Sequence, residues 1–167
     1  MRIYARKYKW YKDLFYQCNV LFDKSVQKDM FDSSRSALSY FIPGRFCAKY
    51  VAIKEHEGKK EKICIGAFMK DQRENVCWIA GFVPSKIQNK GFGIYGGVAC
   101  VNELFKEHPQ YTILSASNAR NNRAVRVTSS MGFQIYVQDE RHFESSLTKE
   151  QFDNEFVKLI KNRYNIK

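Results

Sequence analysis

The chain has 167 residues, enough for one hydrophobic core and too few for two large domains. Its composition, 44% apolar and 27% charged, is typical of soluble globular proteins and excludes a disordered chain. The 28 basic residues exceed the 17 acidic ones and give a net charge of +11, so an anionic partner or substrate is favoured.

Targeting and metal-binding signals are absent from the sequence. No stretch reaches the roughly 18 apolar residues of a membrane span, and the basic, aromatic start does not resemble a signal peptide. We therefore expect a cytoplasmic protein without a membrane partner. The five cysteines form no CxxC pair and the three histidines lie far apart, so we expect reduced thiols and no metal site.

The N-terminal half is predicted to contain one strand and two helices, followed by three further strands. Residues 2–8 read as a strand, and two helices are expected before Pro43 and Gly44. Three apolar runs, 46–55, 62–70 and 76–83, are separated by short polar turns. They predict an antiparallel meander.

The C-terminal half alternates helices and strands. Apolar residues at helical spacing predict a helix that begins near Ile94 and ends near His108. A strand over 111–115, a helix over 121–131 and a strand over 133–138 follow. The crossover makes the 76–83 and 111–115 strands parallel neighbours. Thr148 and Gln151 form a capping box that predicts a terminal helix over 148–164.

A glycine-containing loop, Gln88-Asn89-Lys90-Gly91-Phe92-Gly93, stands between the third strand and the long helix. Glycines allow close backbone approach, and the first amides of a helix have no intrahelical acceptor, so this loop suits a phosphate or pyrophosphate. The dinucleotide pattern G-x-G-x-x-G also fits from Gly91, but Pro84 separates the loop from its strand, and we reject that interpretation. Gly96 and Gly97 indicate either a closely packed ligand or helix-on-sheet contact.

Two motifs on these elements resemble the GNAT family, the GCN5-related N-acetyltransferases. The loop over 88–93 matches the family's Q/R-x-x-G-x-G/A motif. The segment 121–124, Asn-Asn-Arg-Ala, followed by Gly132 and Phe133, is similar to its N-x-x-A helix and closing G-F. The resemblance covers residues 47–138.

The resemblance implies an α/β (mixed α+β) fold, with a central, mostly antiparallel sheet that contains one parallel, splayed strand pair and has helices on both faces. It implies one acetyltransferase-like domain over 1–167, with an acceptor side over 1–45, a cofactor-binding core over 46–138 and a terminal helix over 148–164. The activity implied is N-acetyl transfer with acetyl-CoA as cosubstrate and no metal.

The resemblance also assigns cofactor-binding residues. The backbone of Phe82 and Val83 would pair with the pantetheine arm. Asn121 would meet the same arm, and Arg123, like Arg120 and Arg126, would reach the phosphates. The amides expected to hold the pyrophosphate are those of Gln88, Asn89, Lys90, Gly91, Phe92, Gly93 and Ile94.

Acetyl transfer needs a neutral amine, a stabilised oxyanion and a proton for the departing thiolate. Many family members carry a general-acid Tyr four residues after the Ala of N-x-x-A, and Thr128 takes that position here. Thr128 is thus a catalytic candidate, beside a water, Ser129 or a Tyr from elsewhere. Glu74 is the candidate base, and deprotonation relayed by water is the alternative.

The acceptor is expected to be a small-molecule primary amine. Twelve of the 25 aromatic residues fall within the first 50, and in the family this segment walls the acceptor pocket; they are otherwise ordinary core and surface residues. An amino-sugar nucleotide is preferred, with a protein amine as the alternative acceptor. Two other functions stay open, a non-catalytic acyl-CoA-binding protein and a basic nucleic-acid-binding module, although no nucleic acid is expected. A homodimer is compatible with the sequence.

Overall fold

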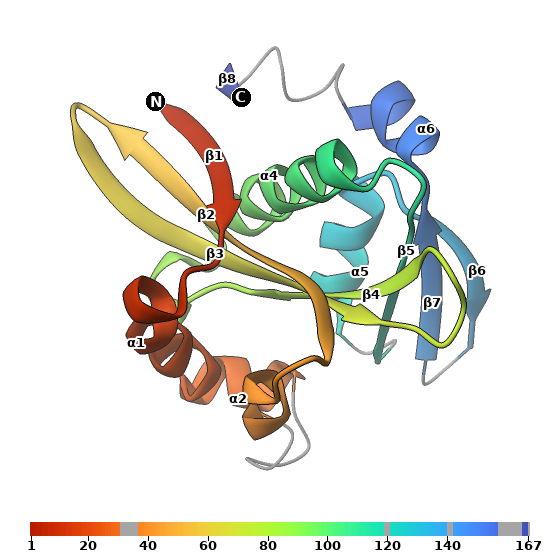
Figure 1. Ribbon diagram of the computed structural model, residues 1–167, viewed down its shortest axis with the longest axis horizontal. Helices are drawn as coiled ribbons and strands as arrows, with labels where there is room; N and C mark the ends of the chain where they lie inside the picture. Colours follow the sequence, from red (N-terminus) through yellow and green to blue (C-terminus); the bar gives the residue numbers. More distant parts are fainter. Residues whose placement is uncertain (31–36, 119–120, 140–141, 157–164, 167) are drawn as a thin grey trace.

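One mixed β-sheet runs through the molecule and carries helices on both faces (Figure 1). The computed structural model describes residues 1–30, 37–118, 121–139, 142–156 and 165–166. The strands follow the order β6-β7-β5-β4-β3-β2-β1-β8 across the sheet. They are β1 (Arg2–Lys7), β2 (Phe46–His56), β3 (Lys59–Lys70), β4 (Val76–Phe82), β5 (Thr112–Asn118), β6 (Gln134–Gln138), β7 (His142–Leu147) and β8 (Asn165–Ile166).

The helices divide between the two faces. One face carries α1 (Trp10–Leu21) and α2 (Lys24–Met30), and the other carries α4 (Phe92–Glu107) and α5 (Asn122–Ser130) (Figure 1). Each layer has its own apolar cluster against the sheet, because strands buried on both sides present apolar residues to both. The fold class implied by the resemblance is confirmed.

Close contact between α4 and the sheet explains the glycines inside that helix. A Cβ on Gly96 would lie 2.6 Å from Cβ of Cys64 on β3, and one on Gly66 would lie 2.6 Å from Cβ of Cys100 on α4. A Cβ on Gly97 would lie 3.0 Å from Sδ of Met131. Helix-on-sheet contact is therefore the correct interpretation for Gly96, whereas Gly97 packs against Met131 at the end of α5.

The parallel strands β4 and β5 pair over three residues only. Val76, Cys77 and Trp78 lie opposite Thr112, Ile113 and Leu114. Beyond Trp78, β4 continues along β3, while β5 continues along β7. The pair is thus both parallel and splayed, as predicted, and it opens a gap toward the ends of the two strands, called here the β4–β5 gap.

The predicted elements are largely confirmed, and the C-terminal region holds the differences. The meander and the two helices before Pro43 are present, and β5 extends to Asn118. The sequence did not predict β7, nor the parallel pairing of β8 with β1. The capping box of Thr148 and Gln151 is present, but α6 (Lys149–Gln151) is short and continues as a π-helical turn, η3 (Phe152–Phe156). Residues 157–164 of the predicted helix lie outside the described residues.

Two features are absent from the described residues. Among them, no helix combines the length and the hydropathy that crossing a membrane requires. The same residues contain no cluster of three His, Cys, Asp or Glu side chains placed to hold a metal ion.

Candidate functional site

The backbone of β4 changes partner along its length. The amide of Asp71 donates to the carbonyl of Val76 (3.3 Å), and the amide of Thr112 donates to the carbonyl of Asn75 (2.9 Å). Because bonding directions alternate along a strand, even-numbered residues of β4 bond toward β3 and odd-numbered ones toward β5. The pair Trp78–Leu114 takes up the amide of Ile79, because in a parallel ladder that amide donates to Leu114. The carbonyl of Ile79 and the backbone groups of Gly81 therefore face the β4–β5 gap, where β5 has moved away.

This register corrects one expectation from the sequence. Phe82 lies opposite Ile65, and its backbone groups point toward β3 rather than into the gap. Its side chain is 2% exposed, in the core on the α1 face. Gly81, one residue earlier, takes the expected position, since it is exposed and a Cβ built on it would meet nothing within 4 Å.

Gln88 holds the loop that borders the gap. Its Nε2 donates to the carbonyl of Val83 (3.0 Å), the other residue expected to pair with the pantetheine arm. Its Oε1 accepts from Oγ of Ser25 on α2 (3.0 Å) and from Nη1 of Arg123 on α5 (2.8 Å). One side chain thus connects the end of β4, α2 and α5. The sequence motif pointed to the Gln88 amide and gave no sign of this side-chain role.

The loop leaves a row of amides open at the start of α4. Gly91 caps the helix with a φ of 79°, a left-handed conformation that favours glycine, and Asn89 has a φ of 60°. Within the part of the chain that the structure describes, the amides of residues 89–93 have no acceptor. The amide of Ile94 donates to the carbonyl of Gly91 (3.2 Å). The sequence predicted that this amide would bind the pyrophosphate, but the bond to Gly91 already occupies it.

Lysines surround the start of α4. Nζ of Lys54 lies 2.8 Å from a carboxylate oxygen of Glu61 and 4.8 Å from the ring centre of Phe92. Lys86 lies 3.8 Å from the other oxygen of Glu61. The hydrogen bond from Lys54 lowers the pKa of Glu61, and the charges of Lys54, Lys86 and Lys90 add to the effect. Three cations against one carboxylate, with open helix amides beside them, make this region suitable for an anion.

The second motif forms the start of α5. Oδ1 of Asn121 accepts a hydrogen bond from the Ala124 amide (3.0 Å), which makes Asn121 the N-cap of the helix. The Ala of the N-x-x-A motif is therefore the residue whose amide the Asn binds. Arg126 is exposed on the same helix, and Arg120 lies outside the described residues.

The two catalytic candidates are not brought together. Thr128, near the end of α5, is 7% exposed. Glu74 is exposed on the turn before β4, beyond the closed end of the gap, where Asn75 already bonds to Thr112. Both stay predictions, and the geometry gives Glu74 no contact with the loop.

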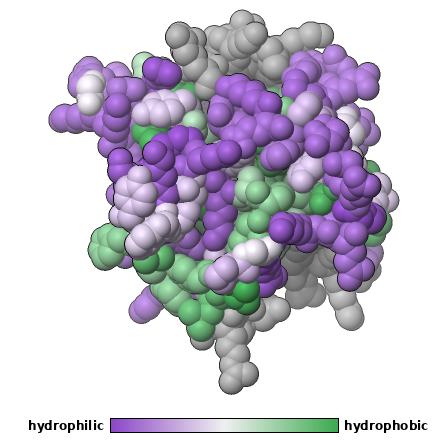
Figure 2. Space-filling model, viewed as in Figure 1, coloured by the Kyte–Doolittle hydropathy of each residue, from purple (hydrophilic) through white to green (hydrophobic). Residues whose placement is uncertain are grey.

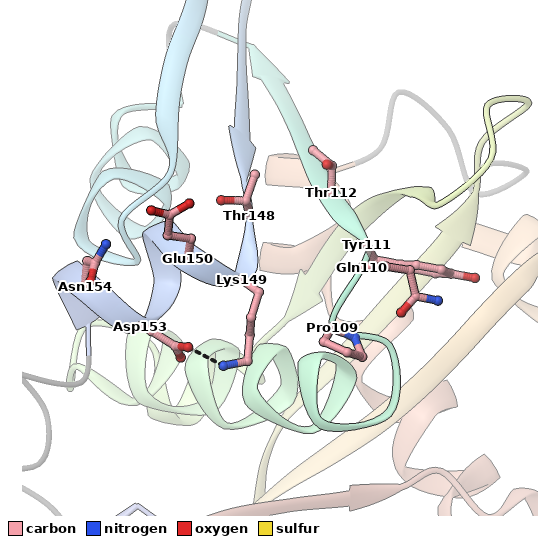
Figure 3. Close-up of a pocket in the computed structure, with 9 residues that line it drawn as sticks. All are labelled: Pro109, Gln110, Tyr111, Thr112, Thr148, Lys149, Glu150, Asp153 and Asn154. Carbon is pink, nitrogen blue, oxygen red and sulfur yellow. Dashed lines mark hydrogen bonds and ion pairs between the residues drawn. The ribbon is translucent and has the colours of Figure 1, made fainter.

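A separate pocket lies at the opposite end of β5 (Figure 3). Its volume is about 590 Å³, and its walls include Tyr111 and Thr112 at the start of β5 and Thr148 before α6. Lys149 and Asp153 form an ion pair across its rim. Because the gap opens at the other end of β5, this pocket belongs to a different part of the molecule.

The N-terminal aromatic residues divide into two groups. Tyr16, Tyr40, Phe41 and Phe46 pack in the apolar cluster between α1 and the sheet. Trp10, Tyr11 and Phe15 are among the most exposed large side chains of the described residues. The first group therefore consists of ordinary core residues. That the N-terminal segment walls the acceptor pocket stays a prediction.

Solved structures of acetyltransferases share this architecture. An acetyltransferase of the GNAT family from Bacillus anthracis is 18% identical, with a TM-score of 0.68 over 90% of this chain and 96% of its own. Aminoglycoside acetyltransferase AAC(6')-Ib, in complex with coenzyme A and kanamycin, is 16% identical, with a TM-score of 0.67 over 91% of this chain and 98% of its own. Spermidine N-acetyltransferase from Vibrio cholerae, in complex with CoA and spermine, is 12% identical, with a TM-score of 0.71 over 92% of this chain and 99% of its own.

The comparisons establish the fold. At identities of 12% to 18%, they show that the chain has the fold of the GNAT acetyltransferases, with its splayed parallel pair. By sequence, the chain matches no protein-family model and no curated protein.

Proposed function

We propose that this chain is an N-acetyltransferase that transfers the acetyl group of acetyl-CoA to a primary amine. The observation that carries the proposal is the β4–β5 gap, which combines unpaired strand backbone with a row of open amides at its rim. A linear molecule with an amide-containing arm and a diphosphate fits this combination. The GNAT fold of the chain supports the same activity.

The residues at the gap fit acetyl-CoA. The carbonyl of Ile79 and the backbone of Gly81 would bond to the pantetheine arm, and the open space beside Gly81 leaves room for it. The amides of residues 89–93 would hold the pyrophosphate, with Lys86 and Lys90 adding charge. Arg123 would stay bonded to Gln88 and add its own charge to the rim. No metal is needed for this reaction.

The chain's own groups define part of the chemistry. The amine nitrogen forms a bond to the thioester carbon and gives up one proton to water, the alternative to Glu74 as the base. The carbon–sulfur bond breaks, and the sulfur leaves as a thiolate that takes up a proton. The amide of Gly81 is the first one beyond the last strand pair that faces the gap without a strand partner, so we assign it to stabilise the oxyanion. We assign the proton of the leaving thiolate to water near Thr128, because an aliphatic hydroxyl is a weak acid.

A small anionic molecule with a primary amine is the acceptor class we favour, such as an amino-sugar nucleotide. Two of the similar structures hold amine-bearing small molecules, kanamycin and spermine, which supports a small amine. Both of those are cationic, whereas this chain carries a net charge of +11, which favours an acceptor with phosphates. A cytoplasmic location, where acetyl-CoA is made and thiols stay reduced, is part of the proposal.

The test has two stages. Isothermal titration should show binding of acetyl-CoA, and a thiol-release assay against a panel of amines should find one that is acetylated. Binding without release for any amine would indicate a non-catalytic acyl-CoA-binding protein. No binding of acetyl-CoA, together with salt-sensitive binding of DNA or RNA, would overturn the proposal in favour of a nucleic-acid-binding module.

A further inference from the structure

Helix α1 carries several large apolar side chains on its outer side, in addition to Val20 and Leu21, which it buries against the sheet. Trp10 is 71% exposed, Tyr11 63%, Leu14 43% and Phe15 79%. Phe22, just past the helix end, is 48% exposed. These five residues, called here the α1 outer face, follow one another at helical spacing and form a continuous stripe. Soluble helices normally bury such a stripe, so this one indicates a surface that is covered in use.

Two buried polar residues of α1, Asp13 and Gln17, fix the rotation of the helix. Asp13 is fully buried and lies 2.7 Å from Nη1 of Arg6 and 2.7 Å from Nζ of Lys62. It also accepts from the amide of Lys9 (2.8 Å). Gln17, 3% exposed, donates to the carbonyl of Tyr40 (3.1 Å). Because rotating α1 would break all of these bonds, the outward apolar stripe is a stable property of the fold.

Basic residues accompany the α1 outer face, and residues 1–22 contain no exposed acidic one. Asp23, which follows Phe22, accepts hydrogen bonds from Ser85. Lys9 and Lys12 are exposed at the start of α1. Between residues 1 and 22 the sequence contains one acidic residue, Asp13, which is buried and neutralised. Figure 2 shows apolar side chains gathered over α1 and α2, next to strongly hydrophilic ones. The stripe is therefore apolar at its centre and cationic at its edge.

We propose that the α1 outer face docks onto an anionic lipid membrane. A helix with Trp, Phe and Leu on one face and lysines beside them is suited to lie in the plane of a membrane interface. Its aromatic side chains would enter the headgroup region, and its lysines would meet lipid phosphates and carboxylates. The expectation of no membrane partner rested on the lack of a spanning segment, which surface binding does not require.

Two other occupants fit the surface less well. A second copy of the chain would bring the same lysines, Lys9 and Lys12, close to the first pair in a twofold interface, with no exposed carboxylate of residues 1–22 between them. A nucleic acid would need a continuous basic track, but Arg6 is bonded to Asp13 and Lys7 to Glu107 (2.8 Å). Charge complementarity thus favours an anionic membrane.

The experiment measures binding of the full chain to vesicles by co-sedimentation. Vesicles of phosphatidylcholine with about 30% phosphatidylserine are compared with vesicles of phosphatidylcholine alone, since the anionic lipid supplies the charge. We expect binding to the first at low salt and a blue shift of Trp10 fluorescence. Trp78, whose Nε1 donates to Asp71 (2.6 Å), is not part of the surface. Leu14→Glu and Phe15→Glu should each lower the bound fraction roughly tenfold.

Ile135→Glu is the matched control. Ile135 lies on β6, at the far edge of the sheet, and is 37% exposed, close to the 43% of Leu14. It should bind vesicles like the wild type, and circular dichroism should show that all variants are folded. Equal binding of wild type and Phe15→Glu, or no vesicle binding at all, would overturn the proposal. So would a dimer that Phe15→Glu dissociates, or binding of single-stranded oligonucleotides in place of vesicles.

Discussion

Arg123 on α5 donates a hydrogen bond from Nη1 to Oε1 of Gln88 (2.8 Å), across 35 residues of sequence. This bond joins the two family-like motifs and closes one side of the rim of the β4–β5 gap. Because Gln88 also bonds to the end of β4 and to α2, it determines where the loop amides lie.

Arg123→Ala should weaken acetyl-CoA binding about tenfold, since it removes both a charge-assisted hydrogen bond and a cation at the rim. Isothermal titration measures the effect. Arg126→Ala is the matched control, because Arg126 is exposed on the same helix and should leave the affinity nearly unchanged. Equal losses in the two variants would show that only overall charge matters and that the bond to Gln88 does not.

Gly91→Val should abolish detectable acetyl-CoA binding while the protein stays folded. The φ of 79° is unfavourable for a β-branched residue, and a Cβ would lie 3.3 Å from the ring of Tyr95, so the loop must move. Gly58→Val imposes the same backbone strain at a φ of 75°, in open space at the β2–β3 turn, and should keep the affinity. Undiminished binding by Gly91→Val would refute the assignment of the loop.

Asp13→Asn should lower the free energy of unfolding by about 2–4 kcal/mol at pH 7, because Arg6 and Lys62 lose a buried counter-charge. Burial alone would raise the pKa of Asp13, but the hydrogen bonds from Arg6 and Lys62 outweigh it and hold the pKa well below its usual range. The carboxylate therefore stabilises the fold above about pH 4 and loses this effect as the pH falls further.

Urea unfolding at several pH values measures this difference, which should shrink below pH 4. Asp153→Asn is the control, since Asp153 forms a surface pair with Lys149 and should change stability little. A constant difference across the pH range would contradict the ionic explanation.

Cys47 should react with iodoacetamide at neutral pH faster than the buried cysteines. A side-chain hydrogen bond with Cys77 lowers the pKa of Cys47 to about 7, whereas that bond and burial raise the pKa of Cys77. Peptide mass spectrometry should show a rate that reaches half its maximum near pH 7. Cys77→Ala removes the donor and should move that midpoint upward, while Cys64→Ala should not. An unchanged midpoint in Cys77→Ala would contradict the pairing.

Thr128→Ala should leave the acetylation rate within about tenfold of the wild type if water protonates the thiolate. Glu74→Gln should change it by less than about threefold, because Glu74 lies beyond the closed end of the gap. Steady-state kinetics with an accepted amine measures both. A loss of about 100-fold or more would identify the residue concerned as a proton carrier.

The sequence predicted the elements that have strong apolar patterns. The three strands of the meander and α4 carry long apolar runs between clear turns, and the crossover rule gave the parallel pair. β7 was missed because Ser145, fully buried, stands between Phe143 and Leu147 on its inward face and interrupts the alternation. The local sequence there is polar, and pairing with β5 and β6 on its two sides makes it a strand.

The site was predictable where a residue type is required by the backbone. Gly91 was found because a left-handed helix cap favours glycine. The choice between Phe82 and Gly81 depends on a one-residue register that no residue type signals. The outward face of α1 could not be predicted from the sequence either. The rotation of the helix depends on the ion pair of Asp13 with Lys62, a residue distant in sequence.

The short contact between β4 and β5 has a mechanical consequence. Only three residue pairs connect the ribbon β6-β7-β5 to the ribbon that begins at β4. Hydrogen bonds between the two ribbons are therefore confined to one end of β4 and β5, and a molecule bridging Gly81 and the opposite strand would act as an additional rung. Ligand occupancy and mechanical coupling of the two ribbons should accordingly rise together.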